Sequence, residues 1–183
     1  MKGADSRYMD IMSFIRRCEA AFPIEKKKPV QLTSEREYKM VSKEVRLLED
    51  SSWLELDGWF FYKYGDVFFD LDNDTFAYFI PGIMSVSLEP RPELYSDAPV
   101  WILFLNLEKI MERIKYPDIE KYSQYNSPLD SFTDEQLKLV REWCGNVVDR
   151  EGDHCITKQE IDTIFSHLIS QTISYDGAHR NID

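Results

Sequence analysis

The stretch Trp59-Phe60-Phe61-Tyr62-Lys63-Tyr64, followed by Gly65-Asp66 and Val67-Phe68-Phe69-Asp70-Leu71, decides between two fold classes. Two aromatic runs on either side of a Gly-Asp pair are typical of a β-hairpin, and a hairpin over residues 59–71 would make the protein α+β. The competing interpretation is a helix capped by Ser51 or Ser52, whose apolar positions recur at helical spacing: Trp53, Leu56, Phe60 and Tyr64.

The sequence that follows this stretch favours helices. Either Asp72 or Asp74 can cap a helix that carries apolar residues at Phe76, Phe79 and Ile80. Pro81 interrupts that pattern, so we expect a kink or a break there and a short apolar helix over residues 82–88. The segment 98–114 is apolar on all sides in its first half, which predicts a mostly buried helix.

Both ends of the chain also carry helical patterns. Pro23 ends an amphipathic pattern whose apolar face we assign to Tyr8, Ile11, Met12, Ile15, Cys18 and Phe22. Capping boxes, in which a Ser or Thr and a Glu or Gln exchange bonds with backbone N–H groups, start at Ser34, Thr133 and Thr157. They predict helices over about 35–49, from 134 and from 158, with a loop over 115–131.

We therefore predict a mainly α protein, a single domain over residues 1–183 built as a bundle of about seven helices. The landmarks of its middle part also support this class. They are Ala21-Phe22-Pro23, Leu32-Thr33, Trp53-Leu54-Glu55-Leu56-Asp57, Phe68-Phe69, Thr75-Phe76-Ala77-Tyr78-Phe79-Ile80-Pro81 and Phe132-Thr133-Asp134-Glu135-Gln136.

In their order, these landmarks resemble an uncharacterised bacterial family, a domain of unknown function. The resemblance covers about residues 21–149 and implies a helical core there, with an added C-terminal helix over 150–173 and a tail over 174–183. It departs from the family pattern at Asp134, where the family usually has proline. No activity is established for that family, so the resemblance implies no catalytic residue.

Charge and cysteine usage exclude several classes of function. The 22 basic and 33 acidic residues give a net charge of −11, which repels a nucleic-acid backbone. The cysteines are Cys18, Cys144 and Cys155, an odd number at wide spacing that suits a reducing compartment. No apolar run of about 18 residues occurs. We expect a cytoplasmic protein with neither a membrane nor a nucleic-acid partner, and the oligomeric state stays open.

The motifs of common catalytic and metal sites are absent from the sequence. The run Asp70-Leu71-Asp72-Asn73-Asp74 matches the first half of a calcium-binding EF-hand loop, but Thr75 and Pro81 stand where that loop needs glycine and glutamate. His154, Cys155 and His167 could ligate a metal only if their segments converge. We expect no metal and no cofactor, and more readily a protein without enzymatic activity than an enzyme.

The remaining feature is a segment in which acidic and aromatic residues coincide. Residues 51–100 carry 2 basic and 9 acidic residues, and 12 of the 25 aromatic residues. We assign Leu56 and part of the aromatics to the core, the aromatics being Trp53, Phe60, Phe69, Phe76 and Phe79. The others fall off that face and, with the neighbouring acids, form a candidate partner-binding site: Asp57, Trp59, Tyr62, Tyr64, Asp66, Asp70, Asp72, Asp74 and Tyr78.

An acidic surface with aromatic anchors suits a basic protein partner, because charge speeds association and buried aromatic contact slows release. The function we expect is therefore that of an acidic interaction protein, most concretely a bacterial immunity-type protein that neutralises a basic toxin or effector. The alternative is a hydrolase or metal-dependent enzyme that uses acids of residues 51–100.

Overall fold

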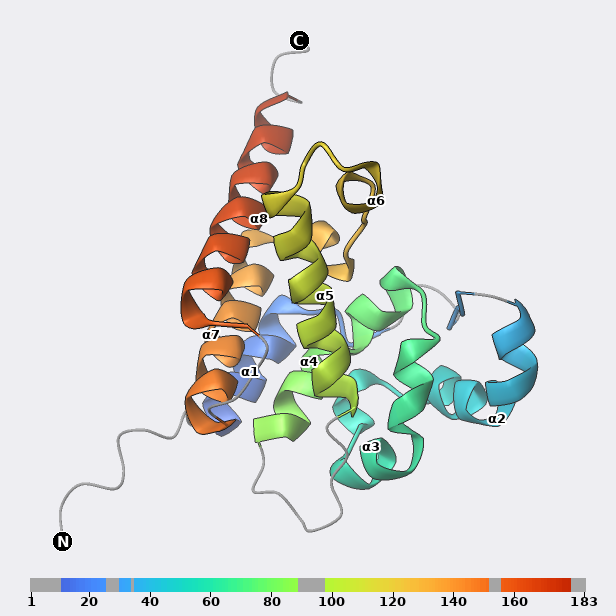
Figure 1. Cartoon of the computed structure of the whole chain (residues 1–183). Helices are drawn as coiled ribbons and strands as arrows, with labels where there is room; N and C mark the ends of the chain where they lie inside the picture. The colour runs from blue at the N-terminus through green and yellow to red at the C-terminus, as the bar shows by residue number, and fades with distance from the viewer. Residues whose placement is uncertain (1–10, 26–29, 34, 89–97, 152–155, 179–183) are drawn as a thin grey trace, which may run out of the picture. The chain divides into compact units, whose positions relative to one another are not determined.

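The computed structural model describes residues 11–25, 30–33, 35–88, 98–151 and 156–178 (Figure 1). Throughout these residues the secondary structure is helical, apart from one isolated β-bridge, which confirms the predicted mainly α class. The α-helices are α1 (Ile11–Ala21), α2 (Glu35–Asp50), α3 (Gly58–Tyr64), α4 (Asn73–Leu88), α5 (Ala98–Lys115), α6 (Glu120–Ser123), α7 (Asp134–Glu151) and α8 (Lys158–Ala178). The 3-10 helices are η1 (Trp53–Glu55), η2 (Gly65–Phe69) and η3 (Pro128–Ser131).

The chain forms two compact units, residues 1–102 and residues 103–183, and the boundary falls within α5. In the first unit α4 is the central helix. Almost every residue of α4 from Thr75 to Leu88 is buried, because its sequence is apolar on all sides. Helix α1 packs against α4 and buries Phe14 and Cys18.

Helix α4 passes through Pro81 without ending. A proline inside a helix lacks the N–H that would bond to the preceding turn, and this costs about 3 kcal/mol. Packing around the helix outweighs that cost, since Pro81 and its neighbours are buried, and the Ser85 hydroxyl donates to the Pro81 carbonyl at 2.8 Å. The separate short helix expected over residues 82–88 is therefore wrong, because these residues continue α4.

Gly82 lets η1 approach α4 closely. A Cβ at this position would lie 2.5 Å from the carbonyl oxygen of Trp53 and 3.2 Å from the Leu56 side chain. The Trp53 indole is buried and donates from Nε1 to the Pro23 carbonyl at 3.0 Å. A residue without a side chain is thus required where η1 crosses α4.

Residues 58–69 form α3 and η2 instead of the alternative β-hairpin, and the helix expected to run from Ser51 or Ser52 to Tyr64 is divided into η1 and α3. The Asp57 carboxylate caps α3 by accepting from the Phe60 N–H at 2.7 Å. Gly65 has φ −56° and ψ −30°, which is helical backbone and not a hairpin turn. Phe61 and Phe68, seven residues apart, are both buried, and this spacing is two helical turns. The strand interpretation fails because the burial follows a helical period.

An aromatic cluster centred on Phe68 joins α3, η2 and α4. Its ring packs edge-on against Phe61 at 5.5 Å, Phe79 at 5.8 Å and Phe76 at 6.5 Å between centroids. Such perpendicular contacts are favourable beyond the area they bury. The expected core positions Trp53, Leu56, Phe76 and Phe79 are confirmed as buried, and Phe60 is half-buried.

The β-bridge pairs Leu32 with Leu71 and holds residues 31–33 against the start of α4. The Asp72 N–H donates to the Gln31 carbonyl at 3.0 Å, and the Gln31 N–H donates to the Thr75 hydroxyl at 3.0 Å. The Asp72 carboxylate accepts from the Thr75 N–H at 2.8 Å and so caps α4. Of the two caps that the sequence allowed, Asp72 is the one used.

The buried face of α1 keeps most of the expected positions, since Cys18 and Phe22 are buried and Ile11 and Ile15 are half-buried. Met12 is 61% exposed, whereas Phe14, which the sequence pattern left out, is fully buried together with Cys18. Both faces fit a helical period, so periodicity alone did not separate them, and the larger Phe14 side chain occupies the interior. Tyr8 lies outside the described residues.

The second unit is organised around the helical hairpin of α7 and α8, drawn in orange and red in Figure 1. Two of the three predicted capping boxes lie in this unit and are formed: Thr133 N–H donates to Gln136 at 2.9 Å, and Thr157 N–H donates to Glu160 at 3.1 Å. The third, at Ser34, lies outside the described residues. The apolar faces that the helical spacing predicts are buried at Leu137, Val140, Cys144 and Val147 on α7 and at Ile161, Ile164, Phe165 and Leu168 on α8, while Ile169, also expected on that face, is half-buried. Helix α8 continues beyond residue 173, the expected end of the added helix.

The segment between α5 and α7, expected as a loop, contains α6 and η3 and is fastened to α5. The Arg113 guanidinium donates to both carboxylate oxygens of Asp130, at 2.9 and 2.8 Å, and to the Tyr125 carbonyl at 2.9 Å. Asp130 also accepts from the Ser127 N–H at 2.7 Å. This bidentate ion pair joins the segment to α5 within the second unit.

Candidate interaction surface

The most exposed aromatic side chains of the predicted site lie on α3. Trp59 is 56% exposed and Tyr62 is 47% exposed, and their ring centroids lie 5.6 Å apart. They stand one helical turn apart, on the side of α3 away from the buried Phe61. Large aromatic residues held in a fixed pair at the surface are the side chains that anchor protein interfaces.

Acidic residues flank this aromatic pair. Asp57 precedes α3 as its cap, and Asp66 stands in the first turn of η2; both are exposed. Lys63 lies over the rings of Trp59, at 6.0 Å, and Tyr64, at 5.2 Å, and is the basic residue within this stretch. We call the exposed residues Asp57, Trp59, Tyr62, Asp66 and Phe69 the α3–η2 surface, since α3 and η2 contact each other.

Phe69 belongs to this surface instead of the core to which we assigned it. Its side chain is 52% exposed at the end of η2, whereas the adjacent Phe68 is buried. The sequence treated Phe69 as part of one long helical face, but the change from α3 to the tighter η2 alters which residues turn inward. The correction adds an exposed aromatic ring next to the predicted acidic residues.

Several other predicted site residues have bonds inside the fold. Asp72 caps α4, and the Tyr78 hydroxyl donates to the Ile24 carbonyl at 2.5 Å. The backbone carbonyl of Asp70 accepts from the Thr33 N–H at 2.8 Å. Tyr64 is half-buried, 5.4 Å from the Phe60 ring. These four residues support the first unit, while Asp74 is exposed in the first turn of α4.

The described residues bring together no group of three His, Cys, Asp or Glu side chains that could hold a metal. His167 lies on α8 with a ring nitrogen 3.0 Å from the Gln171 amide, and burial together with the nearby Arg113 lowers its pKa. Burial raises the pKa of the Cys144 thiol. His154 and Cys155 lie outside the described residues.

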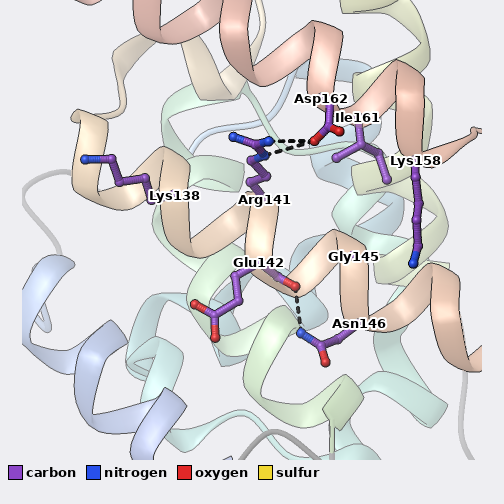
Figure 2. A pocket seen from close by; sticks show the side chains of 8 residues that line it. All are labelled: Lys138, Arg141, Glu142, Gly145, Asn146, Lys158, Ile161 and Asp162. Atoms are coloured by element: carbon purple, nitrogen blue, oxygen red, sulfur yellow. Dashed lines mark hydrogen bonds and ion pairs between the residues drawn. The ribbon is translucent and has the colours of Figure 1, made fainter. Parts of the chain in front are cut away.

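A second surface feature, which the sequence analysis missed, is an open groove of about 520 Å³ along α7 and α8 (Figure 2). Lys138, Arg141 and Gly145 line it from α7, and Lys158 and Asp162 line it from α8. The signal available in the sequence was Gly145, a glycine within an otherwise regular amphipathic helix.

Comparison with protein-family models, with curated proteins and with solved structures finds no match to this chain. Among the described residues, no helix has the length and apolar character that would let it span a bilayer.

Proposed function

We propose that this protein is a non-enzymatic, acidic interaction protein whose α3–η2 surface binds a basic protein partner. The observation that carries the proposal is the exposed Trp59–Tyr62 pair, at 5.6 Å, on a helix that the exposed Asp57 precedes and the exposed Asp66 follows in the sequence. Burying these rings would supply affinity, and the carboxylates would attract and orient a cationic surface.

The net negative charge of the chain also favours a basic partner. The chain carries −11, and residues 51–100 alone carry −7 from 2 basic and 9 acidic residues. Long-range attraction of this kind raises the association rate with a cationic protein and weakens as salt is added. The most concrete form of the function is a bacterial immunity-type protein that covers the functional surface of a basic toxin or effector.

The family resemblance of residues 21–149 remains part of this proposal and adds no activity to it. Cytoplasmic residence is likewise proposed, on the ground of the widely spaced cysteines, of which Cys18 and Cys144 are buried free thiols.

The test is capture of the partner with the tagged protein from its native cells at low and high salt, followed by mass spectrometry. We expect a single basic protein that is retained at low salt and weakened at high salt. Binding of the purified pair should then fall about tenfold or more in Trp59→Ala, as is usual for an aromatic anchor, and in the double variant Asp57→Asn with Asp66→Lys. Asparagine is chosen at Asp57 because it keeps the helix cap while removing the charge.

Matched controls separate the surface from general effects. Trp101→Ala removes a tryptophan that is 46% exposed on α5, and Asp118→Lys reverses an exposed charge outside the α3–η2 surface. Both should leave the affinity within about twofold, because neither touches the proposed contact. Equal losses in the control and surface variants would overturn the site, and a partner bound independently of salt would overturn the electrostatic part of the proposal.

A further inference from the structure

The groove between α7 and α8 has the dimensions of a binding site for a short segment of chain. Lys138 and Gly145 are seven residues apart on α7, and this separation spans about 10 Å at the rise of an α-helix. An extended peptide covers this length with about three residues. The groove is open to solvent, and Figure 2 shows the side chains that line it.

The charge of the groove is opposite to that of the whole protein. Three of its lining residues are cationic, namely Lys138, Arg141 and Lys158, and two are acidic, Glu142 and Asp162. The chain as a whole carries −11. A local excess of positive charge in an acidic protein favours an anionic group at this place, while the surrounding negative charge disfavours a long polyphosphate.

Arg141 is held in position for a further contact. Its Nε and Nη2 atoms both donate to the Oδ1 atom of Asp162, at 3.1 and 2.7 Å. Neither bond uses the other terminal nitrogen, Nη1, which Figure 2 shows on the side of the groove from which Lys138 projects. A carboxylate placed there would accept from Nη1 while the ion pair with Asp162 keeps the guanidinium ordered.

Gly145 provides space on the floor of the groove. Glycine inside a helix is less stable than alanine by about 0.5–1 kcal/mol. At Gly82 a close neighbour explains this cost, but at Gly145, apart from the adjoining residues and the backbone of its own helix, no described atom lies within 4 Å of an added Cβ. The packing of the second unit therefore does not require a glycine here, whereas a ligand backbone lying close against α7 would require one.

We propose that the α7–α8 groove binds an acidic peptide segment of a partner protein. One carboxylate of the segment binds between Lys138 and Nη1 of Arg141, and its backbone passes over Gly145. This site is separate from the α3–η2 surface and has the opposite charge preference, so the two proposals stand or fall independently.

The probe is a fluorescein-labelled oligoglutamate, whose binding is measured by fluorescence anisotropy with the full-length protein at low salt. Wild-type protein should bind it. Lys138→Glu should weaken binding about tenfold, because it replaces an attractive charge at the carboxylate with a repulsive one. Gly145→Met should also weaken it about tenfold by filling the floor, while its melting temperature stays at or above that of the wild type.

Lys121→Glu is the matched control, since Lys121 is an exposed lysine of α6 outside the groove and the net charge changes equally. It should retain the wild-type affinity. Absence of binding by the wild type, equal weakening by Lys121→Glu, or full binding by Gly145→Met would each overturn the proposal. Equally tight binding of an oligothymidylate of the same charge would also overturn it, by showing a general preference for polyanions.

Discussion

The backbone of Trp53 lies so close to Gly82 that a Cβ on Gly82 would come within 2.5 Å of the Trp53 carbonyl oxygen. Because the near atom belongs to the backbone, it cannot move aside as a flexible side chain would. Gly82→Ala should therefore lower the free energy of unfolding by about 1–3 kcal/mol, despite the higher helix propensity of alanine. Urea denaturation of both proteins measures the difference.

Gly145→Ala is the companion to that experiment and should have the opposite sign. An alanine Cβ at Gly145 meets no described atom within 4 Å beyond the adjoining residues and the backbone of its own helix, and the helix gains about 0.5–1 kcal/mol. The free energy of unfolding should rise by about that amount in the same urea titration. A gain of stability at Gly82 would contradict the close approach of Trp53, and a loss at Gly145 would contradict the open space around that position.

The ion pair between Arg113 and Asp130 should be worth more than an ordinary surface pair. The Arg113 side chain is 14% exposed, while Asp130 lies nearer the surface at 29% and also accepts from the Ser127 N–H. Asp130→Ala leaves the guanidinium without its carboxylate and should cost about 2 kcal/mol. Asp118→Ala, at an exposed carboxylate, should cost less than about 0.5 kcal/mol, and a similar loss in both variants would argue against the ion pair.

Glu160 should make the stability of the second unit depend on pH. Hydrogen bonds from Lys115 and then from Thr157 lower the pKa of Glu160 below its ordinary value of 4.5. A carboxyl group with a lowered folded pKa stabilises the fold above its unfolded pKa, and this contribution is lost as the pH falls through the folded pKa.

Glu160→Gln should therefore reduce the free energy of unfolding at neutral pH and approach the wild-type value in acid, well below pH 4.5. Urea titrations across this range measure the difference, and added salt should shrink it because the group is at the surface. Glu135→Gln, at an exposed position in the first turn of α7, should show a smaller change. A difference that grows in acid would contradict the lowered pKa.

The thiols of Cys18 and Cys144 should be protected in the folded protein. Both are buried, and burial raises the pKa of Cys144, which keeps it in the unreactive thiol form. In a Cys155→Ser variant, a thiol-reactive dye should label the remaining two cysteines only after denaturant is added. Rapid labelling without denaturant would show that one of these sites opens.

The sequence carried enough information for the helices that have both an apolar period and a cap. Helices α7 and α8 begin at the capping boxes of Thr133 and Thr157, as predicted, because those bonds are local and need no tertiary contact. The break expected at Pro81 is absent, because the burial of α4 outweighs the cost of the missing backbone hydrogen bond. The sequence does not reveal that burial.

The candidate surfaces were only partly predictable, because tertiary packing decides which side chains are exposed. Trp59 and Tyr62 were assigned to the surface because they fall off the apolar face, and both are exposed. Phe69 was assigned to the core because one helical period was extended across Gly65, where α3 gives way to η2. The α7–α8 groove depends on how two helices lie side by side, and a sequence pattern within one helix does not show it.

Three hydrogen bonds of the first unit join residues far apart in the chain, and this has a consequence for the order of folding. Trp53 bonds to Pro23, Tyr78 to Ile24 and Gln31 to Thr75, which closes loops of 30, 54 and 44 residues. Helices α7 and α8 instead meet across a short connection. Local contacts form fastest, so the C-terminal hairpin should assemble early, and the N-terminal unit should set the folding rate of the chain.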